Sequence, residues 1–229
     1  MKKASLNLKV IIQGIGLIFL TAGFCGCLRS DIANLESRGK NIVCFGDSIT
    51  KGKGVEPDQS YPAALAKMTN YPVVNSGING DISPEAIKRV QTDVLEREPL
   101  LVIIEFGGND YLNKISLAET VKNTEEMIKL IQAKDAMVAI VDISNVLFMG
   151  EYRQELKRLS KKYRAIFIPK ILEDIVTDEQ LKSDAIHPNA RGYKIIAHRV
   201  YRGIIPYLNQ NAILRGTSKK LFDSSKAFR

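Results

Sequence analysis

Leu100-Leu101-Val102-Ile103-Ile104-Glu105-Phe106 decides the fold, because its apolar residues fall on both faces of an extended strand. Strands buried on both sides belong to parallel sheets that helices cover above and below. Four more short apolar runs occupy 41–45, 72–75, 136–142 and 165–168, and amphipathic stretches separate them. This alternation predicts an α/β fold, a three-layer α/β/α sandwich around a five-stranded parallel sheet.

The amphipathic stretches carry helix signals. Ser116-Leu-Ala-Glu119 reads as a capping box, and apolar residues then recur at helical spacing up to Ile131. Ser83-Pro84 opens another helix, since proline is favoured in the first turn. Further helices are expected near 60–68, 151–163 and 189–202.

Composition and charge exclude several classes of protein. The chain has 229 residues, of which 45% are hydrophobic and 25% charged, as expected for one globular domain. The formal charge of +8 resides mainly at the ends: residues 1–27 carry +3 and residues 209–229 carry +4, which leaves +1 for residues 28–208. A nearly neutral body gives no basis for binding a nucleic acid.

The amino terminus predicts export. Three lysines precede an uncharged apolar stretch from Val10 to Leu28, which is the pattern of a signal peptide. The stretch ends in Phe24-Cys25-Gly26-Cys27, which resembles the lipobox of bacterial lipoproteins, with Cys27 as the acylated residue. An uncleaved membrane anchor and plain secretion remain alternatives. We therefore expect a signal peptide at 1–27, a linker at 28–40, one domain at 41–208 and a basic, mobile tail at 209–229.

Polar residues follow the predicted strands where each strand ends. Ser48 follows the first strand in Gly46-Asp-Ser-Ile-Thr50, Gly80 lies in the loop after the second, and Asn109 follows the third in Gly107-Gly-Asn-Asp110. Asp184 and His187 precede the last helix. Ligands collect beyond the carboxyl ends of parallel strands. A nucleophilic serine needs a histidine to accept its proton and a carboxylate to orient that histidine, so this set predicts a hydrolytic site.

Each motif also has a structural interpretation. Asp47-Ser48 alone could cap a helix, and the other motifs could be turns; their joint order at strand ends favours catalysis. The loop from Gly46 to Gly54 is not a phosphate-binding Walker A loop, because Lys53 is followed by glycine. Cys44 is expected in the core, His198 in solvent, and no metal site forms from three cysteines and two histidines in this arrangement.

These blocks resemble the SGNH hydrolases, also called the GDSL esterase/lipase family, over about residues 41–202. The Ser, Gly, Asn and His blocks are Ser48, Gly80, Asn109 and His187, and the wording is closest to the bacterial thioesterase, arylesterase and lysophospholipase group. The resemblance implies the flavodoxin-like fold of this family and no cofactor. It makes Ser48 the nucleophile, His187 the base and Asp184 its orienting group, with an oxyanion hole formed by the N–H groups of Ser48 and Gly80 and the Asn109 side chain.

Substrate and location are less constrained. Val146-Leu-Phe-Met149 and Tyr111-Leu112 could line an acyl groove, or could simply cap the core. We expect a serine hydrolase of acyl esters or thioesters, such as arylesters or lysophospholipids, that acts as a monomer at the cell envelope, anchored to the membrane through Cys27, with a periplasmic or secreted enzyme as the alternative. A second hypothesis is an O-deacetylase of envelope carbohydrate. A third is a non-catalytic binding lipoprotein, against which the intact Ser48, Asp184 and His187 argue.

Overall fold

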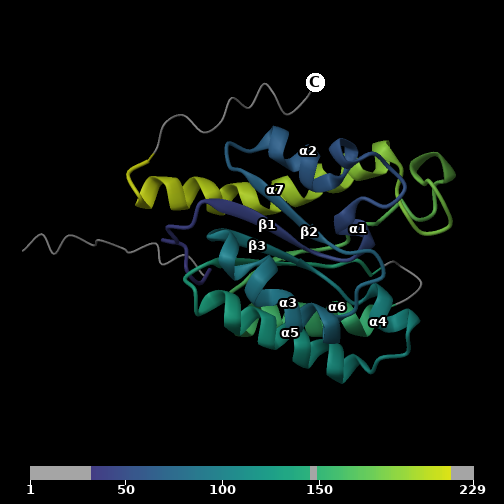
Figure 1. Cartoon of the computed structure of the whole chain (residues 1–229), viewed down its shortest axis with the longest axis horizontal. Helices are drawn as coiled ribbons and strands as arrows, with labels where there is room; N and C mark the ends of the chain where they lie inside the picture. Colours follow the sequence, from purple (N-terminus) through teal and green to yellow (C-terminus); the bar gives the residue numbers. More distant parts are fainter. Residues whose placement is uncertain (1–31, 145–148, 218–229) are drawn as a thin grey trace, which may run out of the picture.

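A five-stranded parallel sheet forms the centre of the molecule. The computed structural model describes residues 32–144 and 149–217. The strands lie in the order β2-β1-β3-β4-β5, and every neighbouring pair is parallel (Figure 1). Their bounds are β1 Asn41–Gly46, β2 Val73–Gly77, β3 Pro99–Glu105, β4 Met137–Val141 and β5 Ile166–Ile168.

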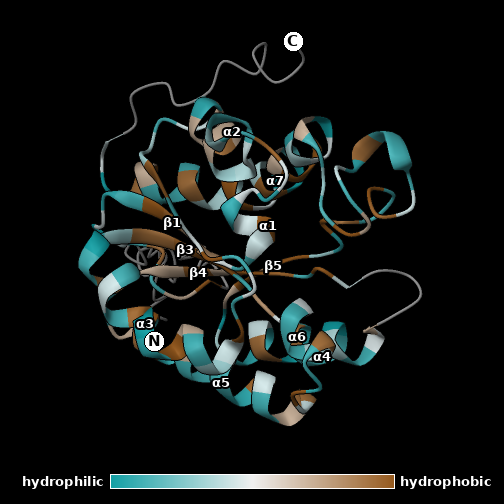
Figure 2. Cartoon of the chain, turned by 45° about the vertical axis from the view of Figure 1, so that its right-hand side comes forward, coloured by the Kyte–Doolittle hydropathy of each residue, from teal (hydrophilic) through white to brown (hydrophobic). Residues whose placement is uncertain are grey.

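Helices cover both faces of this sheet. On one side α2 (Tyr61–Met68) and α7 (Ala190–Leu214) pack against it, and on the other side lie α3 (Ser83–Asp93), α5 (Leu117–Gln132) and α6 (Gly150–Lys162) (Figure 1). The apolar strands run between helices whose outer surfaces are hydrophilic (Figure 2). The predicted α/β/α sandwich is confirmed. The shorter elements are α1 (Ser48–Lys51), α4 (Gly108–Leu112), η1 (Pro57–Gln59), η2 (Leu95–Arg97) and η3 (Glu179–Leu181).

Strand residues alternate between two hydrophobic clusters, one on each face. Ile42 and Cys44 of β1 join the cluster under α2 and α7, whereas Val43 and Phe45 join the cluster under α3, α5 and α6. All seven residues of β3 are buried, as its apolar run predicts. The strand ends lie within two residues of the predicted ones, and the Oγ of Ser116 accepts the Glu119 N–H at 3.2 Å, which confirms Ser116 as the N-cap of α5.

The ordered fold extends beyond the range 41–208 expected for the domain. Ile32 and Leu35 are buried in the core, within the segment expected to be a linker, and the Asn34 side chain donates to the carbonyl of Gln132 at 2.8 Å. Helix α7 continues to Leu214, inside the segment expected to be a tail. Buried Asn211 explains the longer helix, because its amide donates to two carbonyls of the amino-terminal segment. The predicted signal peptide at 1–27 lies outside the described residues.

Candidate active site

Ser48 occupies the sharp turn between β1 and α1. It is the first residue of α1, and Asp47 caps the helix by accepting the Ile49 N–H at 2.9 Å. Gly52 ends α1 in the left-handed conformation at φ 89°, which glycine adopts without steric cost. Because the first N–H groups of a helix have no partner within it, the backbone N–H of Ser48 is not engaged in the hydrogen bonding of α1.

Asp184 and His187 lie in a short loop that leads into α7. A β-bridge joins Lys182 to Pro188 across its base, and the Ser183 N–H donates to the His187 carbonyl at 2.9 Å. The turn lets Asp184 accept the backbone N–H of His187 at 2.9 Å, so the two side chains meet across three residues. Asn189 then caps α7.

The structure brings the three predicted side chains together. Ser48 Oγ lies 3.0 Å from His187 Nε2, and His187 Nδ1 lies 2.7 Å from Asp184 Oδ2. Ser48 and His187 are buried, whereas the Asp184 side chain is 46% exposed. The pKa of Asp184 lies well below its usual value, because the backbone N–H groups of Ile186 and His187 donate to it and the His187 ring adds a further bond. A carboxylate that stays ionised keeps the Nδ1 proton on its own side of the ring and leaves Nε2 free to accept a proton.

Gly80 and Asn109 border the same edge of the sheet. Gly80 has φ 76° and open space where a side chain would project. The Asn109 side-chain amide donates to Asp47 Oδ2 at 2.9 Å and to the Asp81 carbonyl at 3.0 Å. Both of its hydrogens are therefore engaged in this resting arrangement.

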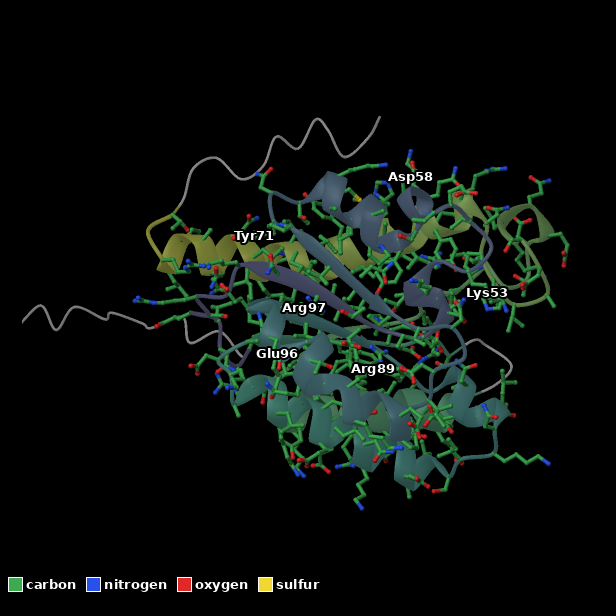
Figure 3. All side chains as sticks on the ribbon, viewed as in Figure 1. Lys53, Asp58, Tyr71, Arg89, Glu96 and Arg97 are labelled. Atoms are coloured by element: carbon green, nitrogen blue, oxygen red, sulfur yellow. The ribbon has the colours of Figure 1, made fainter. Side chains whose placement is uncertain are left out.

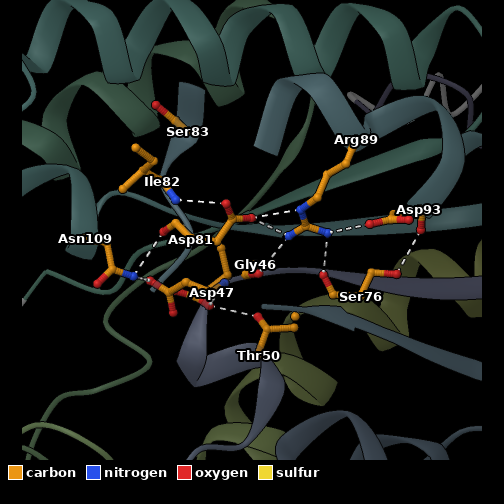
Figure 4. A network of polar contacts seen from close by, with 12 residues as sticks. Gly46, Asp47, Thr50, Ser76, Asp81, Ile82, Ser83, Arg89, Asp93 and Asn109 are labelled. Carbon is orange, nitrogen blue, oxygen red and sulfur yellow. Dashed lines mark hydrogen bonds and ion pairs between the residues drawn. The ribbon is translucent and has the colours of Figure 1, made fainter. Parts of the chain in front are cut away.

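Sequence reasoning missed Arg89, which joins the two loops beside Ser48 (Figure 4). Its guanidinium pairs with Asp81 at 2.6 Å and donates to the Ser76 and Gly46 carbonyls at 2.9 and 3.2 Å. It also lies 4.4 Å from the centroid of the Phe45 ring. Since Gly46 ends β1 and Ser76 lies near the end of β2, Arg89 fixes the Gly80 loop against the turn that carries Ser48. In the sequence it is one of two adjacent basic residues on an amphipathic helix, with nothing to distinguish it from Lys88.

Several carboxyl groups are buried near the turn that carries Ser48, and sequence reasoning did not predict their burial. Asp110 is fully buried and accepts from Ser83 and Thr120. Burial raises the pKa of Asp47 to about 6, with Asp81 and Asp110 adding to the shift. Glu105, the last residue of β3, has no exposed surface. Its signal in the sequence is a single carboxyl in an otherwise apolar strand.

A cavity of about 510 Å³ lies on the α2 side of edge strand β2. Its lining includes Lys51, Lys53, Asn75 and Asn79, so it reaches the residue next to Gly80; Lys53 lies at the same end of the molecule as α1 (Figure 3). This cavity lies apart from the apolar residues that could line an acyl groove or cap the core. Of those, 146–148 lie outside the described residues, and Tyr111 and Leu112 are exposed.

Two further observations concern cofactors and membranes. Within residues 32–144 and 149–217, no three His, Cys, Asp or Glu side chains are grouped so that they could hold a metal ion. In the same part of the chain, no helix has the length and apolar character needed to cross a bilayer. Buried Cys44 packs in the core, as predicted, and burial raises its pKa to about 12.

At the carboxyl edge of the parallel sheet, a serine contacts a histidine that in turn contacts a carboxylate. Serine hydrolases use this arrangement. The model of the GDSL-like Lipase/Acylhydrolase family matches residues 44–195. The chain belongs to this family, and as a member it is a carboxylic ester hydrolase. The resemblance seen in the sequence is confirmed.

The names of proteins with similar sequences agree with this family assignment. The chain is 27% identical to Esterase TesA of Pseudomonas aeruginosa over 196 residues, covering 80% of this chain and 96% of the relative. It is 24% identical to Thioesterase 1/protease 1/lysophospholipase L1 of Escherichia coli over 179 residues, covering 75% and 86%. A shorter similarity, 36% over 103 residues, covers 41% of this chain and 37% of the uncharacterized lipoprotein YqeF of Bacillus subtilis.

Solved structures show the same fold. The crystal structure of TesA has a TM-score of 0.68 and 25% sequence identity, covering 73% of this chain and 99% of that one.

Proposed function

We propose that Ser48, His187 and Asp184 form a catalytic triad that hydrolyses acyl esters or thioesters through an acyl-enzyme. The observation that supports this most directly is the continuous contact from Ser48 Oγ to His187 Nε2 at 3.0 Å and from His187 Nδ1 to Asp184 at 2.7 Å. His187 takes the serine proton as Ser48 attacks the carbonyl, and returns it to the leaving group. Water, activated by the same histidine, then releases the acid.

The proposed oxyanion hole consists of the N–H groups of Ser48 and Gly80 and the Asn109 amide. Open space beside Gly80 supports this role, because a substrate carbonyl can approach its backbone. The Asn109 amide already points to the carboxyl edge, where it contacts Asp47 and Asp81. Donors aimed at a developing oxyanion each contribute about 3 to 4 kcal/mol of transition-state stabilisation.

The proposed substrates are esters with an acyl chain, such as arylesters, thioesters or lysophospholipids. The thioesterase and lysophospholipase relative supports this class, and exposed Leu112, three residues after Asn109, offers an apolar contact for the chain. We expect kcat/KM of the full chain on p-nitrophenyl esters to rise from acetyl to octanoyl, by up to about fourfold for each methylene buried. Leu112→Ser should flatten this rise, whereas Leu214→Ser, at an exposed leucine at the end of α7, should not.

The chain-length series also decides between the alternatives. Cleavage of acetyl esters alone, together with acetate release from acetylated glycans, would replace the acyl-ester proposal with O-deacetylation. Failure to cleave any ester would favour a binding lipoprotein.

We further propose that the enzyme is exported and anchored through an acylated Cys27. The signal pattern and the Gly26-Cys27 pair support this, as does the partial similarity to a lipoprotein. A single acyl chain binds membranes only weakly, so stable anchoring needs more than one chain. Mass spectrometry of the mature protein should find Cys27 as the first residue, carrying acyl groups, and the Cys27→Ser variant should lack those acyl groups. A mature protein that begins at Met1 would contradict the anchor.

A further inference from the structure

Glu105 is a buried carboxyl that the proposed chemistry does not use. It has no exposed surface, and β1 and β3 pair so that Glu105 lies opposite Gly46. A Cβ atom at Gly46 would come within 2.6 Å of Glu105 Oε2. The glycine of the Gly46-Asp47-Ser48 turn thus makes room for this carboxyl directly beneath the turn.

The two oxygens of Glu105 have unequal surroundings. Oε2 accepts the Thr50 hydroxyl at 2.8 Å and the Asp47 N–H at 3.3 Å. Oε1 is buried without a hydrogen-bond partner among the described residues. None of the ion pairs formed within those residues includes Glu105 or Asp47. An ionised carboxylate buried without a cation and with a bare oxygen is strongly unfavourable.

Asp47 has the opposite pattern, because both of its oxygens accept N–H donors. Oδ1 accepts from Ile49 at 2.9 Å and Oδ2 accepts from Asn109 at 2.9 Å. Ionisation suits Asp47, and a proton suits Glu105. Two ionised carboxyl groups side by side repel each other, so a proton on Glu105 favours the ionised form of Asp47.

We propose that Glu105 is a positioning residue that stays a neutral acid beside an ionised Asp47, and that its Oε2 holds the Asp47 N–H and the Thr50 hydroxyl in place. The pair then carries one negative charge, and Asp47 uses it to hold both the first turn of α1, which carries Ser48, and the Asn109 amide (Figure 4). The role in hydrolysis rests on the proposed function.

Neighbouring groups support this charge state. Tyr61 on α2 and Tyr193 on α7 interact with Glu105, and Cys44 on β1 lies beside Tyr61. Burial raises the pKa of each of these acids, so they are uncharged at neutral pH. Near Asp47, the charge of Asp81 is paired with the Arg89 guanidinium, and Asp110 adds negative charge that opposes a second charge on the pair. Burial raises the pKa of Glu105, and Asp47 adds to the shift.

A proton that stays on Glu105 in the folded protein predicts that the stability of the fold depends on pH. An acid whose pKa is raised by folding loses stability as pH rises from the unfolded value, about 4.5 or below, toward the folded value. The unfolding constant of the wild type relative to that of Glu105→Gln should therefore increase with pH, by up to about tenfold per pH unit while one proton remains bound. Glu56→Gln, at an exposed glutamate that makes no side-chain capping bond to η1, is the matched control and should keep a nearly constant ratio.

Urea unfolding of the full-length protein at several pH values measures this ratio and requires no substrate. A ratio for Glu105→Gln that does not change with pH would show that Glu105 is ionised in the folded protein and would overturn the proposal, even in an active enzyme. If the protein cleaves no ester but its ratio of unfolding constants still rises with pH, the proposed function is refuted and the proposal of a neutral Glu105 is supported.

Activity tests the positioning role. The Gln side-chain oxygen can accept the Asp47 N–H and the Thr50 hydroxyl as a neutral acid does, whereas Leu cannot. We expect Glu105→Leu to lower kcat by at least about tenfold at nearly unchanged KM, and Glu105→Gln to restore most of that loss. Equal kcat in the two variants, when both are folded by circular dichroism, would contradict the role.

Discussion

Ser48→Ala should lower kcat on a p-nitrophenyl ester by about 10⁴-fold or more, since it removes the proposed nucleophile that lies 3.0 Å from His187 Nε2. The fold should persist, because Ser48 lies at a helix end capped by Asp47 rather than in the core. Initial rates and circular dichroism on the same preparation measure both effects.

Ser160→Ala is the matched control. Ser160 is a buried serine on α6 whose hydroxyl donates only to the Lys157 carbonyl, one turn earlier. Its loss should leave kcat nearly unchanged. A fluorophosphonate should form one covalent adduct with the wild type and none with Ser48→Ala. Full activity of Ser48→Ala would show that Ser48 is not the nucleophile.

Asp184→Asn should lower kcat by about 10³- to 10⁴-fold, as a result of the histidine tautomer. Asp184 accepts from Nδ1, which leaves Nε2 bare toward Ser48. An asparagine amide in that position can donate to Nδ1 and shift the ring proton to Nε2, where it blocks proton transfer from the serine. Because the Asp184 side chain is 46% exposed, solvent screens its charge, and we attribute the loss to orientation more than to charge.

The control for this prediction is Asp178→Asn. Asp178 is exposed and caps η3 by accepting the Gln180 N–H at 2.8 Å, so it provides the same substitution without a contact to His187. We expect its kcat to stay near that of the wild type. A small loss in Asp184→Asn, close to that of the control, would remove Asp184 from the proposed triad.

The sequence was sufficient for the sheet and for the residues that lie at strand ends. The run from Leu100 to Phe106 has only one stable environment, the centre of a parallel sheet, and that in turn brings the residues after each strand to one edge. Ser48, Asn109 and His187 could be placed in this way because each lies within a few residues of an element that periodicity reveals.

The supporting residues could not be placed in this way. Arg89 reaches the Gly46 and Ser76 carbonyls because α3 packs close to the ends of β1 and β2. The hydrophobic periodicity of the sequence does not predict how close these elements lie. The role of Glu105 depends on its register opposite Gly46. Ile32 and Leu35 looked like part of a polar linker because two apolar residues show no period, and only tertiary packing buries them.

In the absence of substrate, the Asn109 amide donates both of its hydrogens, one to Asp47 and one to the Asp81 carbonyl. If it serves the oxyanion as proposed, its contribution to the rate is a difference between two hydrogen bonds, the one gained in the transition state and the one released. Release of the neutral Asp81 carbonyl costs less than release of the charged Asp47. The amide would thus work as an exchangeable contact that favours the transition state only when an oxygen becomes more negative than a peptide carbonyl, which gives the site a means of discriminating a reacting ester from one that is merely bound.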